Sequence, residues 1–336
     1  MQNIENISQR ESAFSKVVGD NITTERKKEI LKEMADKFEK RLALERPYCE
    51  KIKTKEEIEV IEGINKYLPE FIAQYGGAYL PTDQQDIYFL DGAKFTRKEK
   101  KILAQTMKKR EDAVGFYSPM NQEIVFLKWY NEHPLEKARL IAHELLHFQS
   151  FQALTEHNNN LRTRQMGISF ETPGASNSFF ADLNETVTEW LAILFAKRYF
   201  KKIDCLREEA IELETFNAKF PDEKIYDEVA SIYRKKTEGG QWKTEVISYR
   251  SHPESLKKLD NLMNKIYQKN KERFQTQGDV FNIFARAAMT GDISEMAKLI
   301  EVSLGKGAFK KVAKEFSVTH ENNETQDRDS SGVTSE

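Results

Sequence analysis

The sequence predicts an α+β fold, in which short strands and two central helices lie between helical N- and C-terminal regions. Two observations support this prediction. Apolar residues recur at helical spacing among dense charges near both ends, while the middle contains short runs rich in β-branched and aromatic residues. These changes divide the chain into a helical N-terminal region at 1–77, a core at 78–202, a helical C-terminal region at 203–319 and a disordered polar tail at 320–336.

The N-terminal region is expected to be a loose leader followed by two helices. Residues 1–22 are polar and weakly patterned. Apolar residues then recur every three or four positions at 24–44 and at 55–74, which predicts a helix in each range. Gly76 and Gly77 end the second helix, because glycine commonly follows a helix C-terminus.

The core is expected to begin with strands. A buried strand is predicted at 86–91, and a helix that Thr96 can cap is predicted at 97–109. Two β-rich runs, 113–118 and 123–128, surround a turn that contains proline and asparagine. This pattern predicts a hairpin whose second strand leads into the first central helix.

The central helices are predicted at 134–154, where Pro134 suits the first turn, and at 178–200. Between them we expect a loop at 156–161 and a short strand at 162–171. The C-terminal patterns predict helices at 203–218, 222–236, 253–274, 279–289, 292–304 and 308–316, with an extended stretch at 242–249.

The first central helix contains the H-E-x-x-H arrangement, at His143, Glu144 and His147. Imidazoles four positions apart on a helix lie about one turn apart, so both rings can face one metal ion. Glu144 lies about 60° around the helix from His147, and its carboxylate can therefore reach a metal-bound water without being a ligand.

A catalytic zinc site needs a third protein ligand and an open fourth position. The second central helix has Glu185 and Glu189 one turn apart on one face, which makes Glu185 the leading candidate. Asp182 lies on the same face and is the rival ligand. The other interpretation of these acids is a solvated acidic stripe, which is common on surface helices.

Together the two motifs resemble the gluzincin branch of the zincin metallopeptidases, which pair H-E-x-x-H with a downstream N-E-x-x-x-D/E motif on a second helix. Here the second motif reads N-E-T-V-T-E at 184–189. The resemblance implies that His143, His147 and Glu185 bind one zinc ion. It also implies that Glu189 stands behind the metal and holds an imidazole, that of His143.

The resemblance covers roughly residues 80–200 and implies a zincin-like core. Such a core has a small mixed sheet beside the active-site helix and the glutamate helix, and its antiparallel edge strand, here 113–118, pairs with an extended peptide. The metzincin branch continues from the second histidine as H-x-x-G-x-x-H. Ser150 and Ala153 occupy the glycine and histidine positions, which excludes that branch.

The implied activity is zinc-dependent hydrolysis of a peptide or protein substrate, by either an endopeptidase or an aminopeptidase. Glu144 would accept the proton of the attacking water and pass it to the leaving amine. A tyrosine or histidine from further along the chain usually stabilises the oxyanion in this family. Tyr249 and His252 are the candidates here, although both are equally typical of a surface loop.

Two other functions stay open on the sequence alone. One is a non-catalytic protein that retains the metal site as a structural or sensing module. An intact Glu144 favours the enzyme, because a purely structural site needs the histidines but not this acid. The other is a metal-free helical interaction protein.

The composition of the chain bears on its binding partners and on the compartment in which it works. Lys and Arg (52) nearly balance Asp and Glu (54), and a net charge of −2 gives no indication of nucleic-acid or membrane binding. Two cysteines, Cys49 and Cys205, do not suggest a disulfide scaffold. Because no apolar run approaches about 18 residues and the first residues do not resemble a secretory signal, we expect a cytoplasmic protein. Export by another route and the oligomeric state are left open.

Overall fold

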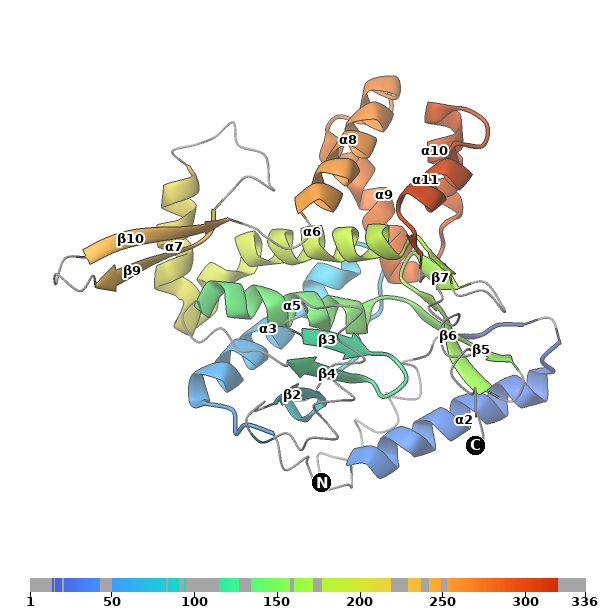
Figure 1. The fold of residues 1–336 in the computed structure, drawn as a ribbon, viewed down its shortest axis with the longest axis horizontal. Coiled ribbons are helices and arrows are strands. Elements are labelled where there is room, and N and C mark those ends of the chain that lie inside the picture. The colour runs from blue at the N-terminus through green and yellow to red at the C-terminus, as the bar shows by residue number, and fades with distance from the viewer. Residues whose placement is uncertain are drawn as a thin grey trace, which may run out of the picture.

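The computed structural model describes residues 14, 16–19, 21–42, 50–82, 84–90, 94, 115–126, 134–157, 160–171, 177–218, 229–236, 242–248 and 253–319 (Figure 1). Within them the predicted α+β class is confirmed, with helices and small mixed sheets. The helices are α2 (Thr24–Leu42), α3 (Lys55–Ala73), α5 (Pro134–Gln149), α6 (Ala181–Tyr199), α7 (Arg207–Asn217), α8 (Pro253–Lys269), α9 (Gln277–Thr290), α10 (Ser294–Leu304) and α11 (Ala308–Glu315). Short 3-10 turns lie at Gln84–Asp86, Phe200–Lys202 and Asp204–Leu206.

The sheet nearest the central helices has three strands in the order β2-β4-β3. They are β2 (Ile87–Phe89), β3 (Gly115–Ser118) and β4 (Glu123–Phe126). The middle strand, β4, is parallel to β2 and antiparallel to β3, so β3 lies at an edge. The strand predicted at 86–91 and the hairpin predicted around the Pro/Asn turn are therefore confirmed.

Helix α5 lies between this sheet and α6, and helices α8 to α11 cover the far side of α6 (Figure 1). One apolar core contains side chains from α3, α5, α6, α8 to α11 and all three strands of the sheet. Aromatic contacts join α3 to α6. The ring of Phe71 in α3 packs edge to face against the rings of Phe195 and Tyr199 in α6. The boundaries predicted at 77 and 202 stay a prediction.

A six-stranded sheet, in the order β1-β5-β6-β7-β8-β11, corrects the predictions between the central helices. Its strands are β1 (Lys16–Val17), β5 (Gln152–His157), β6 (Asn160–Met166), β7 (Ser169–Glu171), β8 (Asn177–Phe179) and β11 (Val318–Thr319). The loop predicted at 156–161 is wrong, because β5 and β6 pair antiparallel there. The leader is also not wholly loose, since β1 pairs with β5.

The first central helix ends at Gln149 rather than near residue 154. The Ser150 hydroxyl donates to the carbonyl oxygen of His147, and the Phe151 N–H donates to the carbonyl of Ala288 in α9. The chain therefore leaves the helix to bond with another helix, which a local pattern does not reveal.

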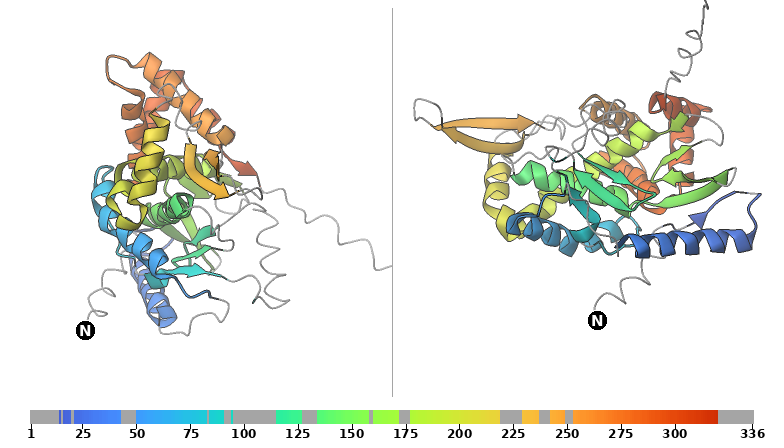
Figure 2. Two further views of the ribbon diagram at one scale, coloured as in Figure 1. Left: turned by 90° about the vertical axis from the view of Figure 1, so that its left-hand side faces the viewer. Right: turned by 60° about the horizontal axis from the view of Figure 1, so that its bottom comes forward.

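The helix predicted at 222–236 is wrong over its described part. Residues 229–236 form strand β9 (Val229–Lys236), which pairs antiparallel with β10 (Trp242–Ser248), the stretch predicted to be extended. Valine, isoleucine and tyrosine in this segment suit a strand, and the partner strand decides the outcome. The β9–β10 hairpin lies beside α7 at one end of the molecule (Figure 2).

The helices predicted near both ends are confirmed, with bounds that differ by a few residues at most of their ends. Four predictions lie outside the described residues: the helix at 97–109, the polar tail at 320–336, Tyr249 and His252. Among the helices that the structure describes, none is long and apolar enough to cross a membrane.

Candidate metal centre

Helix α5 is buried on nearly every side, including the side with the two histidines. Pro134 begins the helix, and the apolar side chains of Ile141, Leu145 and Phe148 face the core. His143, Glu144 and His147 are also buried, with 7%, 8% and 3% of their surfaces exposed. Polar side chains buried to this extent need partners, and α6 supplies them for the two histidines.

The start of α6 is positioned by the turn between β6 and β7. The Asn184 carboxamide oxygen accepts a hydrogen bond of 3.0 Å from the N–H of Ile168. Gly167, in the same turn, has a φ of +55°, and a Cβ at this position would lie 2.2 Å from that oxygen. Only glycine allows this approach without strain, so the asparagine before Glu185 helps to orient the helix.

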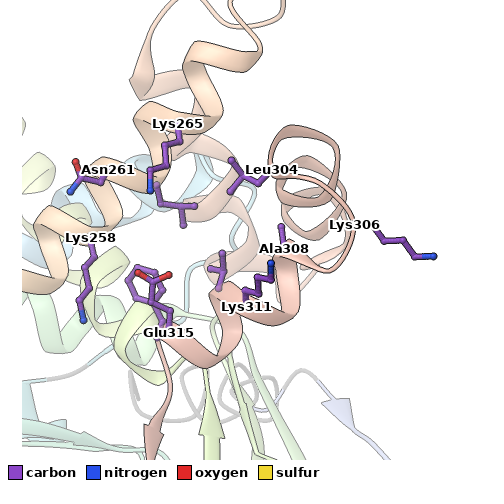
Figure 3. Close-up of a pocket in the computed structure, with 11 residues that line it drawn as sticks. Lys258, Asn261, Lys265, Leu304, Lys306, Ala308, Lys311 and Glu315 are labelled. Carbon is purple, nitrogen blue, oxygen red and sulfur yellow. The ribbon is translucent and has the colours of Figure 1, made fainter.

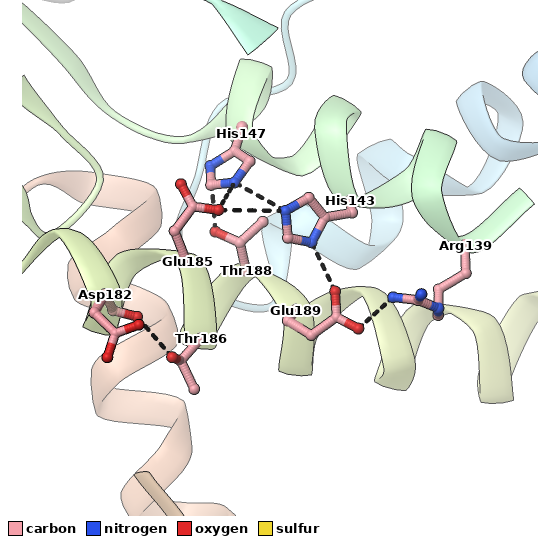
Figure 4. A network of polar contacts seen from close by, with 8 residues as sticks. All are labelled: Arg139, His143, His147, Asp182, Glu185, Thr186, Thr188 and Glu189. Atoms are coloured by element: carbon pink, nitrogen blue, oxygen red, sulfur yellow. Dashed lines mark hydrogen bonds and ion pairs between the residues drawn. The ribbon is translucent and has the colours of Figure 1, made fainter. Parts of the chain in front are cut away.

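The structure brings three donor atoms together between α5 and α6: His143 Nε2, His147 Nε2 and Glu185 Oε2 (Figure 4). The two histidine nitrogens are 3.1 Å apart, and the Glu185 oxygen lies 3.1 Å from His147 and 3.6 Å from His143. Donor atoms about 2.0–2.2 Å from one tetrahedral ion lie roughly 3.3–3.6 Å from each other. The group could therefore hold a metal ion.

Glu189 lies next to His143, at the ring nitrogen that faces away from the three donor atoms. One carboxylate oxygen of Glu189 is 2.9 Å from His143 Nδ1, and the other is paired with the Arg139 guanidinium (Figure 4). A proton on Nδ1 that points at Glu189 leaves the lone pair of Nε2 free for a metal. The structure places Glu189 beside the imidazole of His143, and the hypothesis that it holds this ring stays a prediction.

The imidazole of His147 has a more distant polar neighbour than that of His143. The hydroxyl of Thr188, a buried residue of α6, lies 3.5 Å from His147 Nδ1. It can accept a hydrogen bond from the N–H at this nitrogen, which leaves Nε2 of His147 directed at Glu185. Two successive residues of α6, Thr188 and Glu189, therefore face the outer nitrogens of the two histidines.

Electrostatics at the site favour a cation. Burial alone would lower the pKa of His143, but Glu185, Glu189 and the charge of Glu144 outweigh it and raise the pKa to about 10. Burial would raise the pKa of Glu185, yet His147 and His143 hold it well below its ordinary value. Both directions come from the attraction between protonated imidazoles and the carboxylates beside them, and a bound cation could take the place of those protons.

The rival ligand Asp182 does not join the group. Its carboxylate accepts a hydrogen bond of 2.8 Å from the hydroxyl of Ser255 in α8, and its backbone carbonyl accepts one from Thr186. In Figure 4 it lies well away from both imidazoles. The alternative of a solvated acidic stripe does not describe Glu189, whose side chain is 1% exposed.

Sequence reasoning missed Arg139 and Thr188. Arg139 is four positions before His143, so helical spacing alone places it on the same face, one turn away. The signal was therefore present, but only packing shows that its partner is Glu189. Thr188 lies inside the 184–189 motif and had no separate signal.

We compared the chain with models of known protein families, with curated proteins and with solved structures, and none of them matches it. The fold and the candidate metal centre are therefore described from this chain alone.

Proposed function

We propose that this chain is a zinc-dependent metallopeptidase of the gluzincin type. The observation that carries the proposal is the donor group of two imidazole nitrogens and one carboxylate oxygen, built by H-E-x-x-H on α5 and Glu185 on α6. Imidazole suits several transition metals, whereas magnesium and calcium prefer oxygen ligands alone. Two histidines with one glutamate form a well-known protein ligand set of catalytic zinc.

In the proposed reaction, His143, His147 and Glu185 hold the metal, and Glu189 with Arg139 keeps the His143 ring in place. When bound, zinc supplies Lewis acidity, which lowers the pKa of water and polarises a carbonyl group. The Glu144 carboxylate accepts the proton of the attacking water and delivers it to the departing amine.

Peptide as the substrate class is supported by strand β3. It forms an edge of the three-stranded sheet and packs beside α5. The backbone groups on the outer side of an edge strand can pair with an extended chain, which would align a peptide bond with the site. Tyr249 and His252 stay candidates for oxyanion stabilisation, to be tested by Tyr249→Phe and His252→Gln.

The test is peptide cleavage by Glu144→Gln. Glutamine keeps the size of the side chain but cannot take up the proton, so cleavage of an unfolded protein substrate should fall by about 10²–10⁴. Zinc content, measured by elemental analysis, should stay at the wild-type level. Asp182→Asn is the matched control, an acid-to-amide change near the site that should keep both zinc and activity.

Two results would contradict the proposal in different ways. Full activity of the Glu144→Gln variant would show that Glu144 is not the general base. A wild-type chain that binds zinc but cleaves no peptide, with or without a chelator, would support the non-catalytic metal-binding alternative instead.

A further inference from the structure

A second feature lies away from the metal centre, in a hollow between α8 and α11 (Figure 3). Its volume is about 290 Å³. Pockets that enclose a small-molecule ligand usually measure roughly 300–1,000 Å³. This hollow therefore has the size to receive one or two side chains.

The floor of the hollow is apolar. Leu262 of α8 and Val312 of α11 line it, together with Phe316, which follows α11. All three are buried, whereas Leu304 on the rim is one of the few large apolar side chains that are exposed. An apolar side chain placed here would remove carbon surface from water on both partners.

The rim is basic. Lys258, Lys265 and Lys311 surround the hollow, and Lys306 extends outward from it (Figure 3). Glu315 is the one acid that lines it. Within the described ranges, these four lysines have no carboxylate partner. Elsewhere in this region, Arg273 after α8 and Arg286 of α9 both pair with Glu295 of α10.

We propose that this hollow is a docking site for an acidic peptide segment of a partner protein. One apolar side chain of the segment would fill the floor, and flanking carboxylates would meet Lys258, Lys265 and Lys311. Charge complementarity favours this occupant. Lysines without carboxylate partners around an apolar floor are complementary to a peptide in which acidic residues flank an apolar one. A free phosphate would leave the floor exposed, and a flat membrane surface would not enter a hollow.

The hollow is connected to the helix that carries Glu185. The N–H of Asp182 donates to the carbonyl oxygen of Phe316, over 3.1 Å, and Ser255 of α8 donates to the Asp182 carboxylate. A segment held in the hollow would thus lie next to the N-terminal end of α6. The proposal needs no metal and is independent of the proposed peptidase activity.

The experiment measures binding of a fluorescently labelled acidic peptide with a central leucine flanked by glutamate and aspartate, by anisotropy with the full chain at low salt. Reversal of the rim charges, in K258E/K265E/K311E, should weaken binding by about tenfold or more, because each lost attraction becomes a repulsion. The matched control is K271E/K298E/K310E, which changes the net charge equally at exposed lysines that do not line the hollow.

A second variant tests the apolar contribution of the rim without changing the charge. Leu304→Ser changes an exposed side chain and should keep the fold, yet it should weaken the peptide several-fold. A peptide with glycine in place of the leucine should bind wild-type protein more weakly by a similar factor. Circular dichroism would confirm that all variants are folded.

Five results would overturn the proposal. The first three are equal weakening by the control triple variant, unchanged affinity in the rim variant, and absence of binding up to about 1 mM peptide. The fourth is rim-dependent binding of inorganic phosphate or of anionic phospholipid vesicles without binding of the peptide. The peptide could also bind only to a chain truncated after Thr319. The occupant would then be the chain's own acidic segment 320–336, and the proposal of a partner protein would be wrong.

Discussion

Two networks of arginine and carboxylate side chains use the same chemistry in opposite surroundings. Between α5 and α6, Arg139 pairs with Glu189, and their side chains are 3% and 1% exposed. Between α2 and β5, Arg26 binds Glu156 through two hydrogen bonds, of 2.6 Å and 3.2 Å, with side chains that are 34% and 15% exposed. Arg26 also contacts Glu33 and Glu29 on its own helix.

Burial changes what each network contributes. Two charges removed from water lose their hydration, and their mutual attraction roughly offsets this loss, so a buried pair adds little net stability. Each partner nevertheless becomes indispensable to the other. An exposed pair keeps most of its hydration, and either partner can be lost at small cost. The buried pair lies against His143 Nδ1, whereas the exposed pair joins α2 to β5.

The largest expected effect is on stability, in Arg139→Met. Methionine fills a similar volume but leaves the buried Glu189 carboxylate without its guanidinium. The free energy of unfolding, measured with urea, should fall by about 3–5 kcal/mol. The double variant Arg139→Met/Glu189→Gln should recover much of the loss, because no unpaired charge is then buried. A loss below about 1 kcal/mol in the single variant would show that the two networks do not differ.

The next effect concerns the metal, in Glu189→Gln. The amide oxygen can still accept from His143 Nδ1, but the negative charge that strengthens this ligand is lost. Zinc affinity, measured by competition with a chelator well below the unfolding temperature, should fall by about 10- to 100-fold. Asp182→Asn should leave it unchanged, since Asp182 bonds with Ser255 instead. Equal zinc affinity in both variants would show that Glu189 does not contribute to metal binding.

The sequence predicted the candidate metal centre better than it predicted the sheets, because the motif residues depend on helical spacing. His143 and His147 are one turn apart on any helix, and so are Glu185 and Glu189. The partner of Arg139 could not be predicted, since it depends on how α5 packs against α6. The two-residue strand β1 could not be predicted either, because a strand that short has no periodicity and its partner lies more than 130 residues away.

A smaller effect is expected when the exposed network is disrupted, in Arg26→Gln. The midpoint of thermal unfolding should fall by less than about 2 °C, and the difference from wild type should shrink further at about 0.5 M salt, which screens exposed charges. Zinc affinity should not change. A loss as large as that of Arg139→Met would mean that α2 is fixed to β5 mainly by this contact rather than by apolar packing of Ile30 and Met34 against Leu154.

The smallest effect is the pH dependence of that same contact. Hydrogen bonds from Arg26 lower the pKa of Glu156, and its charge adds to this, against a smaller opposing effect of burial. A carboxyl with a lowered folded-state pKa stabilises the fold above its unfolded-state pKa, and this contribution is lost as the pH falls through the folded-state value. The stability difference between wild type and Arg26→Gln should therefore be present at about pH 6 and should shrink as the pH falls toward about 3. Urea unfolding at both pH values measures it, and groups common to both proteins cancel in the difference. A difference that persists at the lower pH would show that Arg26 acts on α2 through Glu33 and Glu29, or through packing, and not through Glu156.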